Sequence, residues 1–271
     1  MNKIEVVNDI VTSTELDNSI VYEFVPKNEL FDVNDIKLTV VKDTNLIINY
    51  TSTEENKLDV FITIKDNAKL NLYEYRDGAY TKIQYKIYLN ENSKMYVDKF
   101  YDVDEIKEMS IVNLNGINST YDHNFKTICS SLEKYDMVVY HNNKNTNSNI
   151  INNGINIKEG KLNFNISSFI PKGKIECNAN QSSRIVNLTN NKCNINPNLY
   201  VDEYDVIANH AAHIGKFNND ELFYLMSRGI TLEDATNLLI KGFLLNNTNH
   251  QEKIEESINK YWRWYNASRW L

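Results

Sequence analysis

The feature that most limits the possible folds is a long series of short apolar runs between about Asp35 and Asn209. β-Branched and aromatic residues alternate with polar ones in runs such as KLTVV, LDVFITI, KIQYKIYL and KLNFNI, and each run is bounded by Asn, Asp, Gly or Ser. This two-residue period is typical of β-strands with one buried face. The whole chain has only eight glycines and three prolines. The segment is therefore expected to be all-β and poor in the tight hairpins that a meander or sandwich would use.

A weak internal repeat favours one β architecture. Four segments share an apolar pair, a polar corner, and a lysine followed by an apolar residue: ITIKDNAKLNL from Ile62, IYLNENSKMYV from Ile87, INIKEGKLNF from Ile155 and VNLTNNKCNI from Val186. The first two begin 25 residues apart and the last two 31. Intervals of this size are typical of stacked β-solenoid coils. Any unit of strand, turn and strand gives a similar sequence pattern. An arrangement of strands other than a solenoid therefore remains an alternative.

The pattern becomes helical after Gly215. Asn218 or Asn219 is expected to cap a first helix with acidic residues in its first turn, and Gly229 to end it. Thr231 and Asp234 resemble a capping box that opens a second helix. A third helix, from near Asn249, places five apolar side chains at helical spacing: Ile254, Ile258, Tyr261, Trp262 and Tyr265. The predicted organisation is a short N-terminal segment 1–34, a β core 35–215 and a helical region 216–271.

Composition excludes several classes of function. A net charge of −7 and no evident basic face argue against a nucleic-acid partner. The N-terminus lacks the apolar core of a signal peptide, and no apolar stretch of about 18 residues could span a membrane, so a cytoplasmic protein is expected. Three cysteines without a CxxC pair favour reduced thiols. Asparagine, at 43 residues, suits sharp corners between strands because it tolerates left-handed backbone geometry.

The chemical candidates are few. The chain has no Walker loop, dinucleotide fingerprint or G-x-S-x-G motif, so it is not expected to be an enzyme of those classes. His210 and His213 are possible metal ligands, although a pair three residues apart on a strand does not converge on one ion by itself. Cys177 and Cys193 lie in nearby strand-like runs, and thiolate with imidazole suits iron-sulfur clusters. An equally good interpretation is that both cysteines are small residues of the buried core.

The C-terminal YWRWYNASRW is rich in aromatic residues. Trp264 and Trp270 fall off the stripe of the third helix. Because exposed Trp is enriched at protein interfaces, partner contact and self-packing are both open for them.

One stretch carries a family resemblance. Between Asn180 and Phe243, the sequence QSSRIVNLTNNKCNINPNLYVDEYDVIANHAAHIG is followed by ELFYLMSRGI and ATNLLIKGF. Its P-x-L strand, the acidic strand ending in D-V, the H-x-A-x-x-G motif and the L-F-Y-L-x-S-R-G-I helix resemble the C-terminal core of the SufB/SufD family of iron-sulfur cluster assembly scaffolds. The upstream β run is compatible but diverged.

The resemblance implies a right-handed parallel β-helix (a β-solenoid) followed by helices, with no catalysis of its own. It implies docking of the helices on a SufC-type ABC ATPase, pairing with a SufB-like subunit or with itself as a homodimer, and a transient iron-sulfur cluster near the pairing surface, with none bound tightly by this chain alone. The ATPase-binding residues would be those of the first helix: Leu222, Phe223, Tyr224, Met226, Arg228 and Gly229.

Carried over by position, His210 matches the histidine of the family motif at the scaffold interface and is the metal-ligand candidate. SufB-type members have Glu after this histidine and a Cys near Ser182 and Ser183, whereas this chain has Ala211 and no Cys there. It therefore resembles the SufD type more closely. Two alternatives remain: a self-sufficient SufB-like scaffold that uses Cys177 or Cys193, and a β-helix protein that acts on polysaccharide or works as an adhesin.

Overall fold

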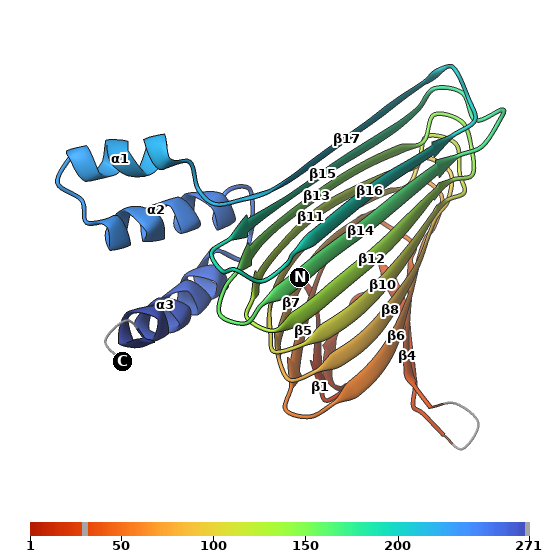
Figure 1. Ribbon diagram of the computed structural model, residues 1–271. Coiled ribbons are helices and arrows are strands. Elements are labelled where there is room, and N and C mark those ends of the chain that lie inside the picture. The colour runs from red at the N-terminus through yellow and green to blue at the C-terminus, as the bar shows by residue number, and fades with distance from the viewer. Residues whose placement is uncertain (29–31, 269–271) are drawn as a thin grey trace.

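The computed structural model describes residues 1–28 and 32–268, with the side chains of 263–268 excepted. In this part of the chain two parallel sheets wind into a solenoid, and three helices follow (Figure 1). The strands are β1 (Asn2–Val7), β2 (Ile10–Glu15), β3 (Ile20–Val25), β4 (Asn34–Val40), β5 (Thr44–Ser52), β6 (Asn56–Ile64), β7 (Lys69–Gly78), β8 (Thr81–Leu89), β9 (Lys94–Val103), β10 (Ile106–Leu114), β11 (Thr120–Cys129), β12 (Leu132–His141), β13 (Asn147–Asn156), β14 (Lys161–Ile170), β15 (Cys177–Asn187), β16 (Asn194–Val201) and β17 (Val206–Gly215). The helices are α1 (Asn219–Ser227), α2 (Leu232–Leu244) and α3 (Gln251–Ser268).

Alternate strands belong to opposite sheets. Sheet A has the order β17-β15-β13-β11-β9-β7-β5-β1-β2, and sheet B has the order β16-β14-β12-β10-β8-β6-β4-β3. Each strand from β5 onward pairs in parallel with the strand two places along the chain, which is the wiring of a coil and not of a meander. The parallel β-solenoid predicted from the weak repeat is confirmed.

Asparagine stabilises the coil in two ways. At one corner, Asn67, Asn92, Asn118 and Asn145 take left-handed φ values of 61°, 53°, 60° and 57° in successive coils. Elsewhere, asparagine amides donate to the asparagine one coil away, at 2.7 Å from Asn71 to Asn45, 26 residues back, and at 3.1 Å from Asn156 to Asn187, 31 residues on. The corner role expected from the sequence is therefore present, and inter-coil amide ladders add to it.

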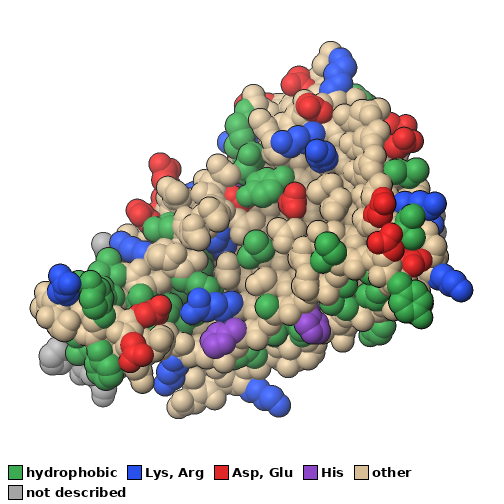
Figure 2. Space-filling view, turned by 90° about the horizontal axis from the view of Figure 1, so that it is seen from above, with side chains coloured by type: hydrophobic (Ala, Val, Ile, Leu, Met, Phe, Trp, Pro, Cys, Tyr) green, Lys and Arg blue, Asp and Glu red, His purple; other side chains and the backbone are tan. Residues whose placement is uncertain are grey.

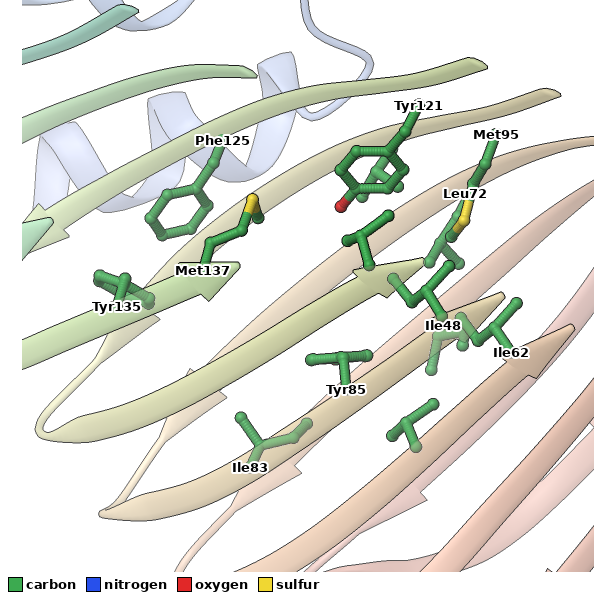
Figure 3. Packing of buried hydrophobic residues seen from close by; sticks show 14 of the residues in the cluster. Ile48, Ile62, Leu72, Ile83, Tyr85, Met95, Tyr121, Phe125, Tyr135 and Met137 are labelled. Atoms are coloured by element: carbon green, nitrogen blue, oxygen red, sulfur yellow. The ribbon is translucent and has the colours of Figure 1, made fainter. Parts of the chain in front are cut away.

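The interior of the coil is mainly apolar (Figure 3), and inward side chains alternate with outward ones along strands such as β4, β6, β8 and β10. It also contains a charged cluster, in which Lys99 Nζ lies 3.1 Å from Glu108 and 3.9 Å from Glu74, and the Arg76 guanidinium lies 3.8 Å from the centre of the Tyr50 ring. Although burial opposes it, the charge and hydrogen bond of Lys99 hold the pKa of Glu108 below its ordinary value. These buried ions are paired, as low-dielectric surroundings require.

The N-terminal residues continue the solenoid. Strand β1 pairs in parallel with β5 and antiparallel with β2, and β3 pairs antiparallel with β4. The described residues among 1–34, which the sequence predicts as a short N-terminal segment, contribute strands to both sheets. Their antiparallel pairs close one end of the coil.

The helix signals in the sequence match the structure. Asn218 accepts a hydrogen bond from the backbone N–H of Asp220 at 3.0 Å, and Gly229 has φ 84° just beyond α1. At the start of α2, Thr231 Oγ1 accepts from the N–H of Asp234 at 3.1 Å. The stripe of α3 packs into a second apolar core against the outer face of sheet A, with these buried members: Phe100, Ile128, Ile155, Val186, Phe217, Ile240, Leu244, Ile254, Ile258 and Tyr261.

Two aspartates of β9 attach α3 to the solenoid. The fully buried Asp98 accepts hydrogen bonds from the backbone N–H of Asn249 at 2.7 Å and from Thr248 Oγ1 at 3.1 Å. About two helical turns further along the chain, Ser257 Oγ and Lys260 Nζ donate to Asp102 at 2.8 Å and 3.2 Å. Backbone groups at a helix start need such acceptors, and here a strand supplies them.

Replacing Asp98 with Ala is expected to loosen this attachment. The half-buried Thr248 hydroxyl and the backbone N–H of Asn249 would lose their acceptor, so the free energy of unfolding should fall by about 1–3 kcal/mol. Urea unfolding measures the loss, and amide hydrogen exchange should accelerate in α3 first. The exposed Asp104→Ala, on the turn after the same strand, is the matched control; an equal loss there would contradict the assignment.

A buried carboxyl group predicts a pH dependence. Glu133 is wholly inside the coil and accepts from Thr127 Oγ1 at 2.7 Å and Tyr135 Oη at 2.8 Å, yet burial raises its pKa from 4.5 to about 7. Because the folded-state pKa is the higher one, ionisation destabilises the fold. The penalty is absent below pH 4.5, grows as the pH rises and levels off above about 7.

The neutral variant Glu133→Gln should escape this penalty. Its stability relative to the wild type is expected to rise by on the order of 3 kcal/mol between pH 4.5 and pH 8. Urea unfolding at both pH values checks the difference, with the exposed Glu91→Gln as control. A difference that does not change with pH would refute the role of Glu133.

Candidate functional site

The upper end of the solenoid in Figure 1 is formed by β16, β17 and the turn 202–205, together called the open end. Within the described strands, β16 pairs only with β14, and β17 only with β15, so each leaves one edge without a partner. Large apolar side chains are exposed here, with Tyr204 fully exposed and Ile207 and Tyr200 more than half exposed. Exposed edges with apolar side chains mark sites of association.

The two candidate histidines both lie on β17 but on opposite faces. His210 is in register with Gln181, which is buried inside the coil, whereas His213 is in register with Arg184. Since side chains alternate along a strand, His210 lies over the uncovered interior and His213 lies on the outer face. Both side chains are exposed. Figure 2 shows histidine side chains on this end of the molecule that are separated from each other. The pair therefore does not form a shared ligand set within one chain.

The candidate cysteines are separated from each other and from the histidines. Cys177 begins β15, buried, with its Sγ 3.2 Å from Thr146 Oγ1, while Cys193 follows the other end of β15 and packs in the main core. An 11-residue strand places them roughly 30 Å apart at about 3.3 Å per residue. Cys177 is in register with Val206, four positions before His210 and so about 13 Å from it along the strand. Burial also raises the pKa of the Cys193 thiol, which disfavours the thiolate.

No three His, Cys, Asp or Glu side chains in the described part of the chain are placed to hold a metal ion together. An exposed imidazole such as that of His210 could contribute one ligand to a site completed by another subunit. Nor does any described helix have the length and apolarity needed to cross a membrane.

The residues expected to contact an ATPase lie on and just after α1. Phe223 and Tyr224 are 65% and 60% exposed, Met226 is also exposed, and none of the α1 side chains, all of them described, is fully buried. Leu222 differs, because it packs into the second core. Arg228 Nη2 donates to Tyr224 Oη at 3.2 Å. The exposed side chains form a surface here called the helical face: Phe223, Tyr224, Met226 and Arg228.

A row of lysines was not evident in the sequence. Lys57, Lys82, Lys107 and Lys134 are in register on four neighbouring strands of sheet B, all exposed, along a groove of about 350 Å³. The two end members are ion-paired, Lys57 with Asp32 and Lys134 with Asp136, each at 2.7 Å. The signal in the sequence was the spacing of the lysines, which equals one coil and becomes meaningful only once the register is known.

The aromatic tail is only partly placed. Trp262 lies partly buried against the second core, whereas Trp264, Tyr265 and Trp270 fall outside the side chains that the structure describes.

Comparison with known proteins identifies related sequences. The family described as "SUF system FeS cluster assembly, SufBD core domain" matches residues 27–243. The iron-sulfur cluster assembly protein SufD of Bacillus subtilis is 36% identical over 148 residues, which cover 53% of this chain and 33% of that protein. SufBD family proteins of Galdieria sulphuraria and Pyrococcus horikoshii are 34% and 37% identical over 109 and 99 residues, 38% and 34% of this chain and 47% and 22% of theirs. Each alignment thus covers less than half the length of the relative.

Proposed function

Because the chain belongs to the SufBD core family of the SUF iron-sulfur cluster assembly system, we propose that it is a non-catalytic, SufD-like scaffold subunit. It would bind a SufC-type ABC ATPase through the helical face and pair through the open end with a SufB-like subunit or a second copy. The observation that carries this proposal is the presence of two separate exposed apolar surfaces, one on the last coil and one on the helix that follows it.

The open end would hold the iron-sulfur cluster during its assembly. His210 lies over the uncovered interior of the last coil, where a paired subunit would cover it. We assign it one imidazole ligand of a transient iron-sulfur cluster, with the other ligands supplied by the partner, since clusters accept mixed thiolate and imidazole ligation. Closure of two ATP-bound ATPases would move the paired solenoids through their helices.

A self-sufficient scaffold based on Cys177 and Cys193 is less well supported. The two thiols are buried at opposite ends of one coil, so they cannot meet at one cluster without unfolding the strand between them. The polysaccharide or adhesin alternative has no support from the family match.

The ATPase contact is tested by co-expression with a SufC-type ATPase. Phe223→Asp combined with Arg228→Glu places an acid in an apolar contact and reverses a charge. The amount of ATPase that co-purifies should therefore fall by about tenfold or more. Lys82→Glu with Lys107→Glu, on the outer face of sheet B, is the matched control and should leave it unchanged. Unimpaired co-purification of the helical-face variant would refute the docking surface.

Pairing is tested by light scattering of the chain alone and with a SufB-like partner. Tyr200→Asp combined with Ile207→Asp should convert the dimer to monomers, because two charges would be buried at the open end. Ile10→Asp with Val21→Asp provides the matched control, since these exposed side chains lie at the opposite end of the solenoid. Equal dissociation by both pairs, or by neither, would count against pairing at the open end.

A further inference from the structure

A partly open pocket of about 230 Å³, here called the apolar chamber, lies at the junction between the helices and the solenoid. Its floor comes from the outward side chains of Ile128 on β11 and Ile155 on β13, and from Leu188 beyond β15. All three helices contribute to its walls, chiefly through Leu222, Ile240, Ile258, Tyr261 and Trp262.

The size and the lining of the chamber are unusual for a packing defect. Protein interiors are close-packed, and few of their voids exceed the volume of a water molecule. Water gains little in an apolar cavity, whereas an apolar cavity of about 150 Å³ is already enough to bind benzene. The chamber is larger and is lined mainly by apolar side chains, some of them buried members of the second core, so it has room for a small apolar molecule.

The margin of the chamber is polar and positively charged. Among the described lining residues, Lys158 and Lys216 carry ammonium groups, against the single carboxylate of Glu233. Lys158 Nζ lies 4.8 Å from the centre of the Tyr261 ring, at the apolar wall. Burial, followed by the nearby charge of Lys260, lowers the pKa of Lys158, while the carboxylates of Asp102 and Asp104 act in the opposite direction.

We propose that the apolar chamber is a binding site for a medium-chain carboxylate, with the hydrocarbon tail enclosed by the three helices and the carboxylate at Lys158 and Lys216. Apolar ligand sites commonly combine an enclosed hydrophobic body with a few polar groups that fix the orientation of the ligand. The proposal does not depend on an ATPase or scaffold partner, because the floor and walls named above belong to one chain.

Calorimetric titration of the purified chain with octanoate tests the site. Octanoate is expected to bind the wild type, and Thr236→Phe, which places a ring in the chamber from α2, should weaken binding by at least about tenfold. Leu222→Phe is a second filling variant from α1, and circular dichroism with thermal unfolding verifies that each variant is folded. Absence of octanoate binding to the wild type, or binding unaffected by the folded filling variants, would overturn the proposal.

The polar margin is tested with ligands of different charge. Lys158→Gln with Lys216→Gln should weaken octanoate binding by about fivefold or more and leave octanol binding unchanged, while Lys82→Gln with Lys107→Gln affects neither. Octylammonium binding as tight as octanoate would refute the role of the lysines.

Methyl NMR of the wild type gives a check that needs no variant: nuclear Overhauser contacts from octanoate should reach the methyl groups of Ile155 and Ile240, and their absence in the bound state would place the ligand elsewhere.

Discussion

The in-register stacking of parallel coils governs the rest of this molecule. Because each strand pairs with the strand one coil away, a side chain at a given position lies directly above its counterpart, about 4.8 Å away. Whatever residue type recurs at that interval forms a row: asparagines at the corner, apolar side chains inside, lysines on sheet B. Left-handed corners recur for the same reason, and asparagine meets their backbone requirement at a smaller conformational penalty than most residues.

The sequence predicted those features that depend on local chemistry. The helix caps at Asn218 and Thr231 and the stop at Gly229 follow from neighbouring residues, so they could be read without knowledge of the fold. The solenoid could be inferred because its repeat is longer than one strand–turn–strand unit. That repeat is still visible in the spacing of the apolar runs. What could not be inferred depends on register. The lysine row, the separation of Cys177 from Cys193 and the inward face of His210 require knowing which residue stacks on which, whereas the opposite faces of His210 and His213 follow from alternation along one strand.

Buried polar groups were also beyond the sequence. Glu74, Arg76 and Lys99 occupy inward positions that alternation would assign to apolar residues, and they are stable there because successive coils place their charges and tyrosine hydroxyls together. The aspartates Asp98 and Asp102 are a similar case on the outer face. They hold the start and middle of α3 through donors about 150 residues away in sequence, which no local pattern reveals. These contacts make the helical region an attached part of the solenoid, so a force applied to its helices would be transmitted to β9 and the coils around it.

The two ends of the solenoid differ in how their last strands pair. At the N-terminal end the antiparallel pairs β1 with β2 and β3 with β4 replace the parallel pattern and finish each sheet with a short strand. Short edge strands limit further pairing of a sheet. At the C-terminal end β16 and β17 have no antiparallel partner among the described strands, and Tyr200, Tyr204, Ile207 and His210 are exposed. Both ends expose apolar side chains, since Ile10 and Val21 at the first end are about as exposed as Tyr200 and Ile207 at the second, so the antiparallel pairing and the exposed imidazole are what distinguish the two ends.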